Sequence, residues 1–184
     1  VDTVQELFDV AGMLAGQPIP DGTGVAIVTN AGGPGVMTTD AIGESGLDLA
    51  SFTDSTLESL QDGLPTGANV YNPIDVIGDA DVERFAEAID ETLADPNVDA
   101  AIVVACPTAT LSFSGLAERV VDLQADYGKP VATSLMGGES TRDAQSILSR
   151  AGIPTYFDPA RAVRGLDALA EYKTITERTY VDPA

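Results

Sequence analysis

The chain has 184 residues, of which 44% are hydrophobic, and this length and composition are typical of a globular protein with a substantial core. Its 29 acidic and 9 basic residues give a net charge of −20, which disfavours nucleic acid and anionic membranes as partners. The sequence contains no histidine and a single cysteine. We therefore predict no internal disulfide, no metal site and no histidine-activated nucleophile.

The acidic residues are spread along the whole chain rather than gathered in one segment. Dispersed acidity with few lysines resembles proteins of salt-loving organisms, because at molar salt the Debye length falls to about 3 Å and like charges are screened. We therefore expect a halophilic origin. The lone Cys106, and the lack of a leader peptide or of a membrane-spanning apolar run, favour a cytoplasmic location.

Residues 1–22 are predicted to form a leading helix and a linker. Apolar residues recur at helical spacing over residues 3–15, and the proline-containing segment 17–22 ends that helix. The chain begins at Val1 in the middle of this pattern, which suggests a piece of a longer protein.

The rest of the chain alternates predicted strands and helices. Residues 24–29 form the first strand, and the glycine-rich turn after them leads into a helix that ends near Ser45. Further strands are predicted at 47–50, 72–76, 100–105, 130–135 and 153–156, and further helices begin near residues 54, 79, 113, 141 and 158. This alternation predicts an α/β fold with a mainly parallel sheet covered on both faces.

Four loops follow the carboxyl ends of the predicted strands, where parallel sheets bind their ligands. They span residues 30–35, 75–79, 106–112 and 136–140. The first loop joins a buried strand to a helix N-terminus, where backbone N–H groups and the helix dipole favour an anion. We predict a phosphate site here, against the alternative of a tight turn only, and its candidate residues are Asn30, Ala31, Gly32, Gly33, Gly35 and Val36.

Four ordered motifs cover nearly the whole chain and together resemble one family. They read VAIVTNAGGPGVM, NPIDVIGDAD, KPVATSLMGGES and AGIPTYFDPARAVRGLDAL. In this order and spacing they are similar to the ADP-forming acyl-CoA (acetyl-CoA) synthetases, also called NDP-forming, of the succinyl-CoA synthetase superfamily. The resemblance extends from residue 1 to about residue 173 and implies a flavodoxin-like, three-layer CoA-ligase domain at 23–173, followed by a C-terminal linker at 174–184.

The resemblance also implies a reaction. The family interconverts acyl-CoA, ADP and phosphate with carboxylate, ATP and CoA through an acyl phosphate and a phosphohistidine. In the family the histidine lies in a second CoA-ligase domain, and CoA-binding and ATP-grasp domains complete the enzyme. The present domain, which has no histidine, would point a helix N-terminus at the phosphoryl group. It would be inactive alone and bind no cofactor tightly, whereas an oligomeric parent would use CoA, ADP or ATP, phosphate and Mg²⁺.

Several other residues admit two interpretations. Gly137, Gly138 and Glu139 are candidates for a second rim of the phosphate site, although Glu139 also suits a helix cap. Asn30 either donates to an oxyanion or caps the turn, and Asp75 suits turn formation. Cys106 fits a small buried apolar residue better than a nucleophile. Arg161 and Arg164 suit a solvated face or an interdomain salt bridge better than CoA binding.

Two alternatives to the synthetase interpretation stay open at the level of the sequence. The first is a non-catalytic synthetase-like domain fused to a regulatory protein or an acetyltransferase. The second is a stand-alone flavodoxin-like or receiver-like domain. The first strand ends in Thr29-Asn30-Ala31 rather than in the acidic pair of receivers, and the four loops contain no Trp or Tyr to flank a flavin ring.

Overall fold

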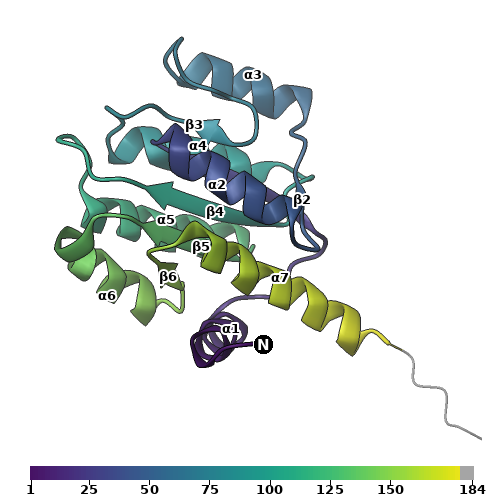
Figure 1. The fold of residues 1–184 in the computed structure, drawn as a ribbon. Coiled ribbons are helices and arrows are strands. Elements are labelled where there is room, and N and C mark those ends of the chain that lie inside the picture. The colour runs from purple at the N-terminus through teal and green to yellow at the C-terminus, as the bar shows by residue number, and fades with distance from the viewer. Residues whose placement is uncertain (179–184) are drawn as a thin grey trace, which may run out of the picture.

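A parallel sheet forms the centre of the computed structural model, which describes residues 1–178 (Figure 1). The strand order is β2-β1-β4-β5-β6, and β3 pairs with β1 beyond the end of β2. Every pairing between these strands is parallel. The strands are β1 (Gly24–Thr29), β2 (Asp48–Leu49), β3 (Ile74–Asp75), β4 (Ala100–Ala105), β5 (Val131–Leu135) and β6 (Thr155–Tyr156).

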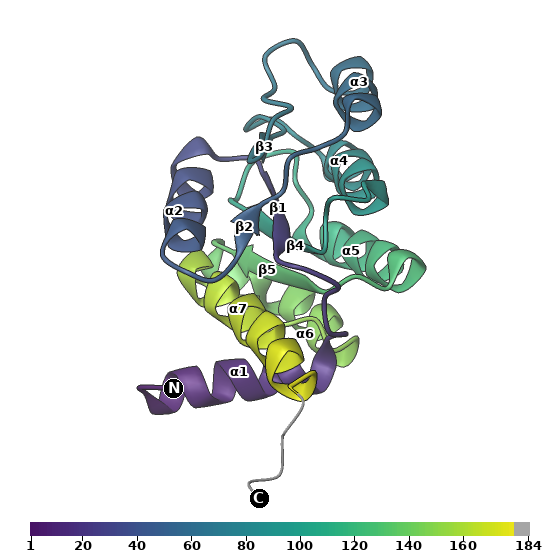
Figure 2. The ribbon, with the colours of Figure 1, turned by 90° about the vertical axis from the view of Figure 1, so that its right-hand side faces the viewer.

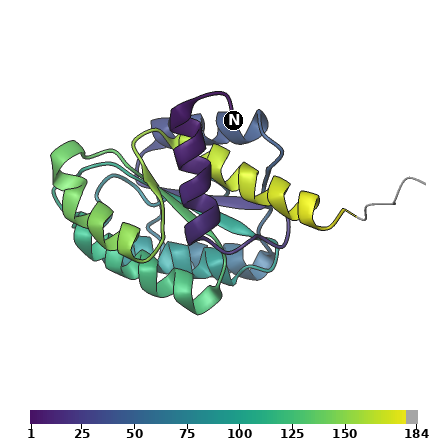
Figure 3. The ribbon, with the colours of Figure 1, turned by 90° about the horizontal axis from the view of Figure 1, so that it is seen from below.

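Helices cover both faces of this sheet, as Figure 2 shows. One face carries α2 (Gly32–Gly43) and α7 (Pro159–Thr176), and α1 (Val4–Gly16) packs against α7. Figure 3 views the molecule from the edge that α1 crosses. The other face carries α3 (Asp54–Gly63), α4 (Val82–Ala94), α5 (Phe113–Tyr127) and α6 (Arg142–Arg150), which the short 3₁₀ turn η1 (Gly138–Thr141) precedes.

The burial of the central strands explains why their sequences are apolar without a break. In β4, Ala100, Ile102 and Val104 pack toward α1, α2 and α7, whereas Ala101 and Val103 pack toward α4 and α5. Alternate residues of a strand point to opposite faces, so a strand covered on both sides needs apolar residues throughout. The predicted α/β sandwich with a mainly parallel sheet is therefore confirmed.

A side chain fills the place in the sheet where β2 stops and β3 has not yet begun. The Asn72 amide donates to the carbonyls of Val25, at 2.8 Å, and Ala50, at 3.0 Å, and accepts from the N–H of Ile27 at 3.0 Å. Buried backbone groups need partners, so this one side chain replaces a missing stretch of strand. Sequence reasoning predicted a short strand over 72–76 and gave Asn72 no role.

The C-terminal end of the last helix differs from the predicted one. Helix α7 continues to Thr176, so the first three residues of the predicted linker at 174–184 are helical. Residues 179–184 of that linker lie outside the described residues. Among the helices of residues 1–178, none is both long and apolar enough to cross a membrane.

Candidate functional site

Helix α2 begins without a side-chain cap. Its N-cap residue is Ala31, which has no hydrogen-bonding side chain. By contrast, the side chains of Thr3, Thr53, Asp81, Ser112 and Asp158 cap α1, α3, α4, α5 and α7. An uncapped first turn leaves N–H donors for another acceptor, and the helix dipole favours a negative one.

The free donors of α2 belong to Gly32 and Gly33. Within residues 1–178 neither N–H has a protein acceptor, whereas the Ala31 N–H donates to Thr29 Oγ1 at 3.1 Å and the Gly35 N–H to the Ala31 carbonyl at 3.1 Å. Both free groups lie on exposed residues at the carboxyl end of β1. The turn can therefore offer two N–H groups to an anion that approaches from solvent.

The glycines of this turn have different surroundings. A Cβ on Gly33 would meet nothing within 4 Å, so Gly33 leaves open space at the helix end. A Cβ on Gly35 would lie 3.0 Å from Thr29 Cγ2, so Gly35 lets α2 approach the sheet closely. Val36, one residue further, is 57% exposed. Of the predicted phosphate-site residues, Gly32 and Gly33 offer donors, and Gly35 serves packing.

Asn30 holds two loops together. Its side-chain amide donates to the Cys106 carbonyl at 3.0 Å, and its Oδ1 accepts from the Cys106 N–H at 2.9 Å. Asn30 is 4% exposed, so this reciprocal pair ties the ends of β1 and β4 inside the protein. The structure thus gives Asn30 a bridging role that neither of its two predicted interpretations included.

Cys106 is partly buried and lies beside the loop that follows β5. Its thiol lies 3.8 Å from the Met136 sulfur, and the Met136 N–H donates to the Ala105 carbonyl at 2.9 Å. Burial raises the pKa of the Cys106 thiol. A raised thiol pKa disfavours the thiolate, which supports the interpretation of Cys106 as a packing residue.

The candidate second rim has a different geometry from the first. A Cβ on Gly137 would lie 2.7 Å from Phe113 Cε2, so packing requires this glycine. Gly138 has a φ of 57°, the left-handed region that favours glycine. Glu139 extends into solvent and pairs with Arg142 at 3.1 Å. The rims follow β1 and β5, which have β4 between them, so two strand spacings place the rims about 10 Å apart.

The two arginines of α7 bind the leading helix. Arg161 donates to both oxygens of Asp9 at 2.7 Å, and Arg164 donates to Glu6 at 2.6 Å. The Arg161 guanidinium lowers the pKa of the Asp9 carboxyl through this side-chain hydrogen bond. Both arginines therefore hold α1 against α7 through ion pairs within this chain. They do not belong to a free, solvated face.

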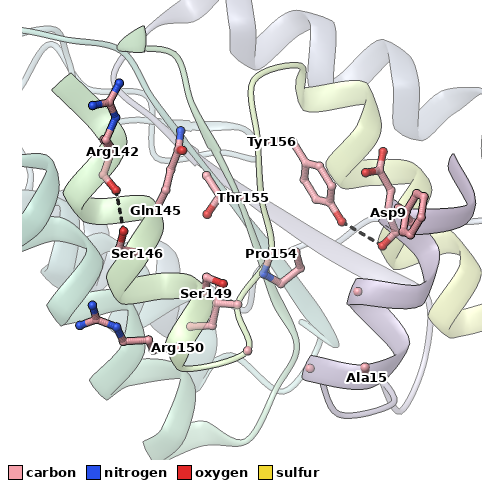
Figure 4. Close-up of a pocket in the computed structure, with 15 residues that line it drawn as sticks. Asp9, Ala15, Arg142, Gln145, Ser146, Ser149, Arg150, Pro154, Thr155 and Tyr156 are labelled. Carbon is pink, nitrogen blue, oxygen red and sulfur yellow. Dashed lines mark hydrogen bonds between the residues drawn. The ribbon is translucent and has the colours of Figure 1, made fainter. Parts of the chain in front are cut away.

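An open hollow of about 920 Å³ lies between α1 and α6, along the free edge of β6 (Figure 4). Phe8 and Ala15 line one side, and Arg142 and Arg150 belong to the other. None of its lining residues is a candidate for the first rim of the phosphate site. The hollow is therefore separate from the loops that follow β1, β3 and β4.

Comparison with known families assigns the fold and these loops to one class of protein. Residues 25–174 match the Ligase-CoA domain, and the chain belongs to this family. Over 97% of its length it is 41% identical to an acetate–CoA ligase (ADP-forming) I of Archaeoglobus fulgidus. Over 92% of its length it is 37% identical to the alpha subunit of acetate–CoA ligase (ADP-forming) I of Pyrococcus furiosus.

Solved structures agree with this family. A protein of Pyrococcus horikoshii OT3 is 35% identical with a TM-score of 0.90, and the match covers 97% of this chain and 42% of that one. Acetyl-coenzyme A synthetase 1 of Ca. Korarchaeum cryptofilum, solved in complex with phosphate and ADP, is 30% identical with a TM-score of 0.87. That match covers 98% of this chain and 40% of the synthetase chain. The chain also spans only 25% of the A. fulgidus ligase and 37% of the P. furiosus subunit, so it corresponds to one part of each of these relatives.

Proposed function

We propose that this chain is one domain of an ADP-forming acyl-CoA synthetase, and that the α2 N-terminus forms part of the site of its transferring phosphoryl group. The observation that carries the proposal is the uncapped first turn of α2, with the free N–H groups of Gly32 and Gly33. It occurs in a chain similar over nearly its whole length to ADP-forming acetate–CoA ligases.

The proposed reaction is the conversion of acyl-CoA, ADP and phosphate to carboxylate, ATP and CoA. This chain contains no histidine, so the phosphohistidine would come from a second CoA-ligase domain. CoA-binding and ATP-grasp domains of the same parent would bind CoA and nucleotide. Residues 1–178 contain no cluster of three or more metal-ligating side chains, and the parent would use Mg²⁺ together with its nucleotide.

In this proposal the domain supplies electrostatic stabilisation. Preorganised donors aimed at charge that develops in a transition state are typically worth a few kcal/mol, and loss of one donor from the oxyanion hole of an acyl-transfer enzyme costs about 2.7–4 kcal/mol. The net charge of −20 opposes anion binding, so local donors must act against the field of the surface. Salt at molar concentration weakens that field, since its Debye length is about 3 Å. Gly137, Gly138 and Glu139 remain the proposed second rim.

The experiment that tests this function compares one substitution at the two ends of α2. Gly33→Glu places a carboxylate at the proposed phosphoryl site, whereas Gly43→Glu places the same group at the other end of the helix. A Cβ meets nothing within 4 Å at either position. In the full-length parent, in multi-molar KCl, we expect Gly33→Glu to lower ADP- and phosphate-dependent CoA release from acetyl-CoA about 100-fold or more. Gly43→Glu should retain activity.

Each other outcome has a definite meaning. Equal activity of Gly33→Glu and wild type, with an unchanged melting temperature, would reduce the glycine turn to a connection between β1 and α2. A parent that releases CoA from no acyl-CoA would instead support a non-catalytic domain of a regulatory or acetyltransferase fusion.

A halophilic, cytoplasmic setting is part of the same proposal. The acidic surface should destabilise the fold by self-repulsion in dilute buffer and be screened in concentrated salt. We expect the melting temperature of the chain to rise steeply between 0.1 and 2 M KCl (roughly a Debye-length change from 10 to 2 Å). A melting temperature independent of KCl would contradict the halophilic assignment.

A further inference from the structure

Helix α1 has its charged side chains toward the protein and its apolar side chains toward solvent. Glu6 and Asp9 form ion pairs with arginines of α7, and both carboxylate side chains are largely buried. By contrast, Val4, Leu7 and Phe8 are 72, 51 and 68% exposed. A surface helix of an isolated domain normally buries its apolar side and exposes its charges, so α1 is built in the opposite sense.

The exposed apolar side chains of α1 form one stripe along the helix. We call this stripe the outer face, and it consists of Val4, Leu7, Phe8, Ala11 and Leu14. Steps of three and four residues place these side chains on one side of the helix, with the spacing by which one helix packs against another. A Cβ on the neighbouring Gly12 would meet nothing within 4 Å. The outer face is therefore exposed to solvent within residues 1–178, and it carries no charge.

The hollow between α1 and α6 adjoins the outer face (Figure 4). Phe8 belongs to both, because it lines the hollow and is mostly exposed. A partner that covers the outer face can therefore also enter the hollow. Such a contact would be separate from the α2 N-terminus, since no residue of the glycine turn lines the hollow.

Helix α1 is a feature of the longer relatives rather than of the Ligase-CoA domain alone. The family model matches residues 25–174, which leaves α1 outside it. The matches to the A. fulgidus ligase and to the P. horikoshii protein each cover 97% of this chain, so both include most of α1. This chain spans only 25% and 42% of these two relatives. A contact of α1 with the remainder of such an enzyme would explain why its apolar side is left open.

We propose that the outer face of α1 is the docking surface for an apolar, uncharged helix of another domain of the same parent. This inference rests on the proposed function only in that it needs a parent with further domains. The facing helix packs its side chains between those of the outer face and covers Phe8. The domain is then held along α1, and the α2 N-terminus stays open to the phosphoryl group.

Two other partners fit the outer face less well. Helices that bind membrane surfaces are rich in Lys and Arg, whereas α1 contains neither. A second copy would bring together two chains that each carry a net charge of −20. A domain linked within the same parent meets α1 at a high effective concentration and needs no such encounter.

The test measures the reactivity of a single thiol on the outer face of the full-length parent. Ala11→Cys replaces a small exposed side chain of α1, and Ala125→Cys does the same on α5, on the other face of the sheet. In multi-molar KCl we expect iodoacetamide to modify the thiol of Ala11→Cys about 10-fold more slowly than that of Ala125→Cys, or slower still. The difference should not depend on protein concentration. Mass spectrometry of the peptide that contains the new thiol separates it from Cys106.

Substitutions added to the Ala11→Cys parent test whether docking causes the protection. Phe8→Glu places a charge on the outer face and should restore fast modification. Tyr71→Glu is the matched control, because Tyr71 is 60% exposed and lies near β2 at the opposite edge of the sheet. It should leave the modification slow. Both aromatic residues are exposed, so neither substitution should unfold the parent, which a melting temperature checks.

Equal rates in Ala11→Cys and Ala125→Cys would overturn the inference, because the outer face would then be open in the parent. Protection that is lost on dilution would assign the face to a second copy, and protection that requires added phospholipid vesicles would assign it to a membrane. Either result also overturns the inference. The proposed function is judged separately: slow modification of Ala11→Cys together with full activity of Gly33→Glu would retain this inference and contradict the proposed function.

Discussion

The two ends of the sheet differ in how their polar groups are satisfied. At the amino end, the side chains of Gln17 and Lys129 form hydrogen bonds with backbone groups. At the carboxyl end, the backbone N–H groups of Gly32 and Gly33 have no acceptor in residues 1–178. The Gln17 side chain accepts from the Val131 N–H at 2.8 Å and donates to the Gly152 carbonyl at 2.9 Å. Lys129 donates to the carbonyls of Leu93 and Asp95 at 2.7 and 2.8 Å. Burial lowers the pKa of Lys129.

This difference separates the stabilising end of the fold from the binding end. Buried polar groups that are satisfied within the protein contribute to stability and leave nothing for a ligand. Free N–H groups at an exposed helix end form hydrogen bonds with water and therefore add nothing to the stability of the fold. They can, however, bind an anion. Substitutions at the amino end should therefore change stability, and those at the free helix end should change function.

The largest stability effect is expected at the close contact between Gly152 and Gly16. Gly152 has a φ of 76°, and a Cβ there would lie 2.9 Å from the Gly16 carbonyl oxygen. Gly152→Ala should lower the free energy of unfolding by about 3 kcal/mol, from the left-handed backbone and the steric overlap together. Urea denaturation at constant high salt measures it.

Gly128→Ala is the control for this effect. Gly128 also has a positive φ, 64°, but a Cβ there meets nothing within 4 Å. It should cost only about 1 kcal/mol, the backbone contribution alone. Equal effects of the two substitutions would show that the contact between Gly16 and Gly152 adds nothing to stability.

The next largest loss of stability is expected at the buried hydrogen bonds between Asn30 and Cys106, at the carboxyl end of the sheet. Asn30→Ala removes both hydrogen bonds to the Cys106 backbone in a buried position and should cost about 2 kcal/mol. Asn97→Ala, which removes an exposed hydrogen bond to the Ser51 carbonyl, should cost under about 0.5 kcal/mol in the same assay. If the two variants were equally stable, Asn30 would not be a bridge.

Asp95 gives a smaller effect with a pH signature. Burial alone would raise the pKa of this carboxyl, but hydrogen bonds from Thr53, Thr56 and Asn97 together hold it below its ordinary value of 3.8. The stabilisation is therefore present above that value and is lost as the pH falls through the lowered pKa. Asp95→Asn should cost about 1–2 kcal/mol at pH 7.

The gap between wild type and Asp95→Asn should narrow as the pH is lowered below about 4, because the wild-type carboxylate becomes protonated. Parallel denaturation series at several pH values in high salt measure the gap. A gap that stays constant down to pH 3 (about one unit below the ordinary Asp pKa) would show that charge plays no part.

The smallest expected effect is at the free helix end. Gly33→Ala adds a methyl group in open space and should raise the free energy of unfolding by up to about 1 kcal/mol, since alanine is the better helix former. Gly35→Ala, whose Cβ would lie 3.0 Å from Thr29, should lower it instead. A destabilised Gly33→Ala would indicate that a side chain at position 33 meets neighbouring atoms rather than open space.

Most of the secondary structure followed from local patterns in the sequence. The unbroken apolar runs at 24–29 and 100–105 indicated strands buried on both faces, and both became central strands. The shortest strands were the hardest to place, because β2, β3 and β6 have two residues each and carry little periodicity of their own. Neighbouring strands, and in one place the Asn72 amide, determine where they pair.

The sequence by itself determined the α/β class, the glycine-rich turn before α2 and the absence of histidine, because each is a local or compositional property. Only the tertiary structure decided that Asn30 bridges to Cys106, that Gln17 reaches Val131, and that Asp75 lies beside Gly32. These contacts join residues far apart in the chain. They depend on the strand order, which places β3 and β4 on opposite sides of β1, and periodicity within one segment carries no information about that order.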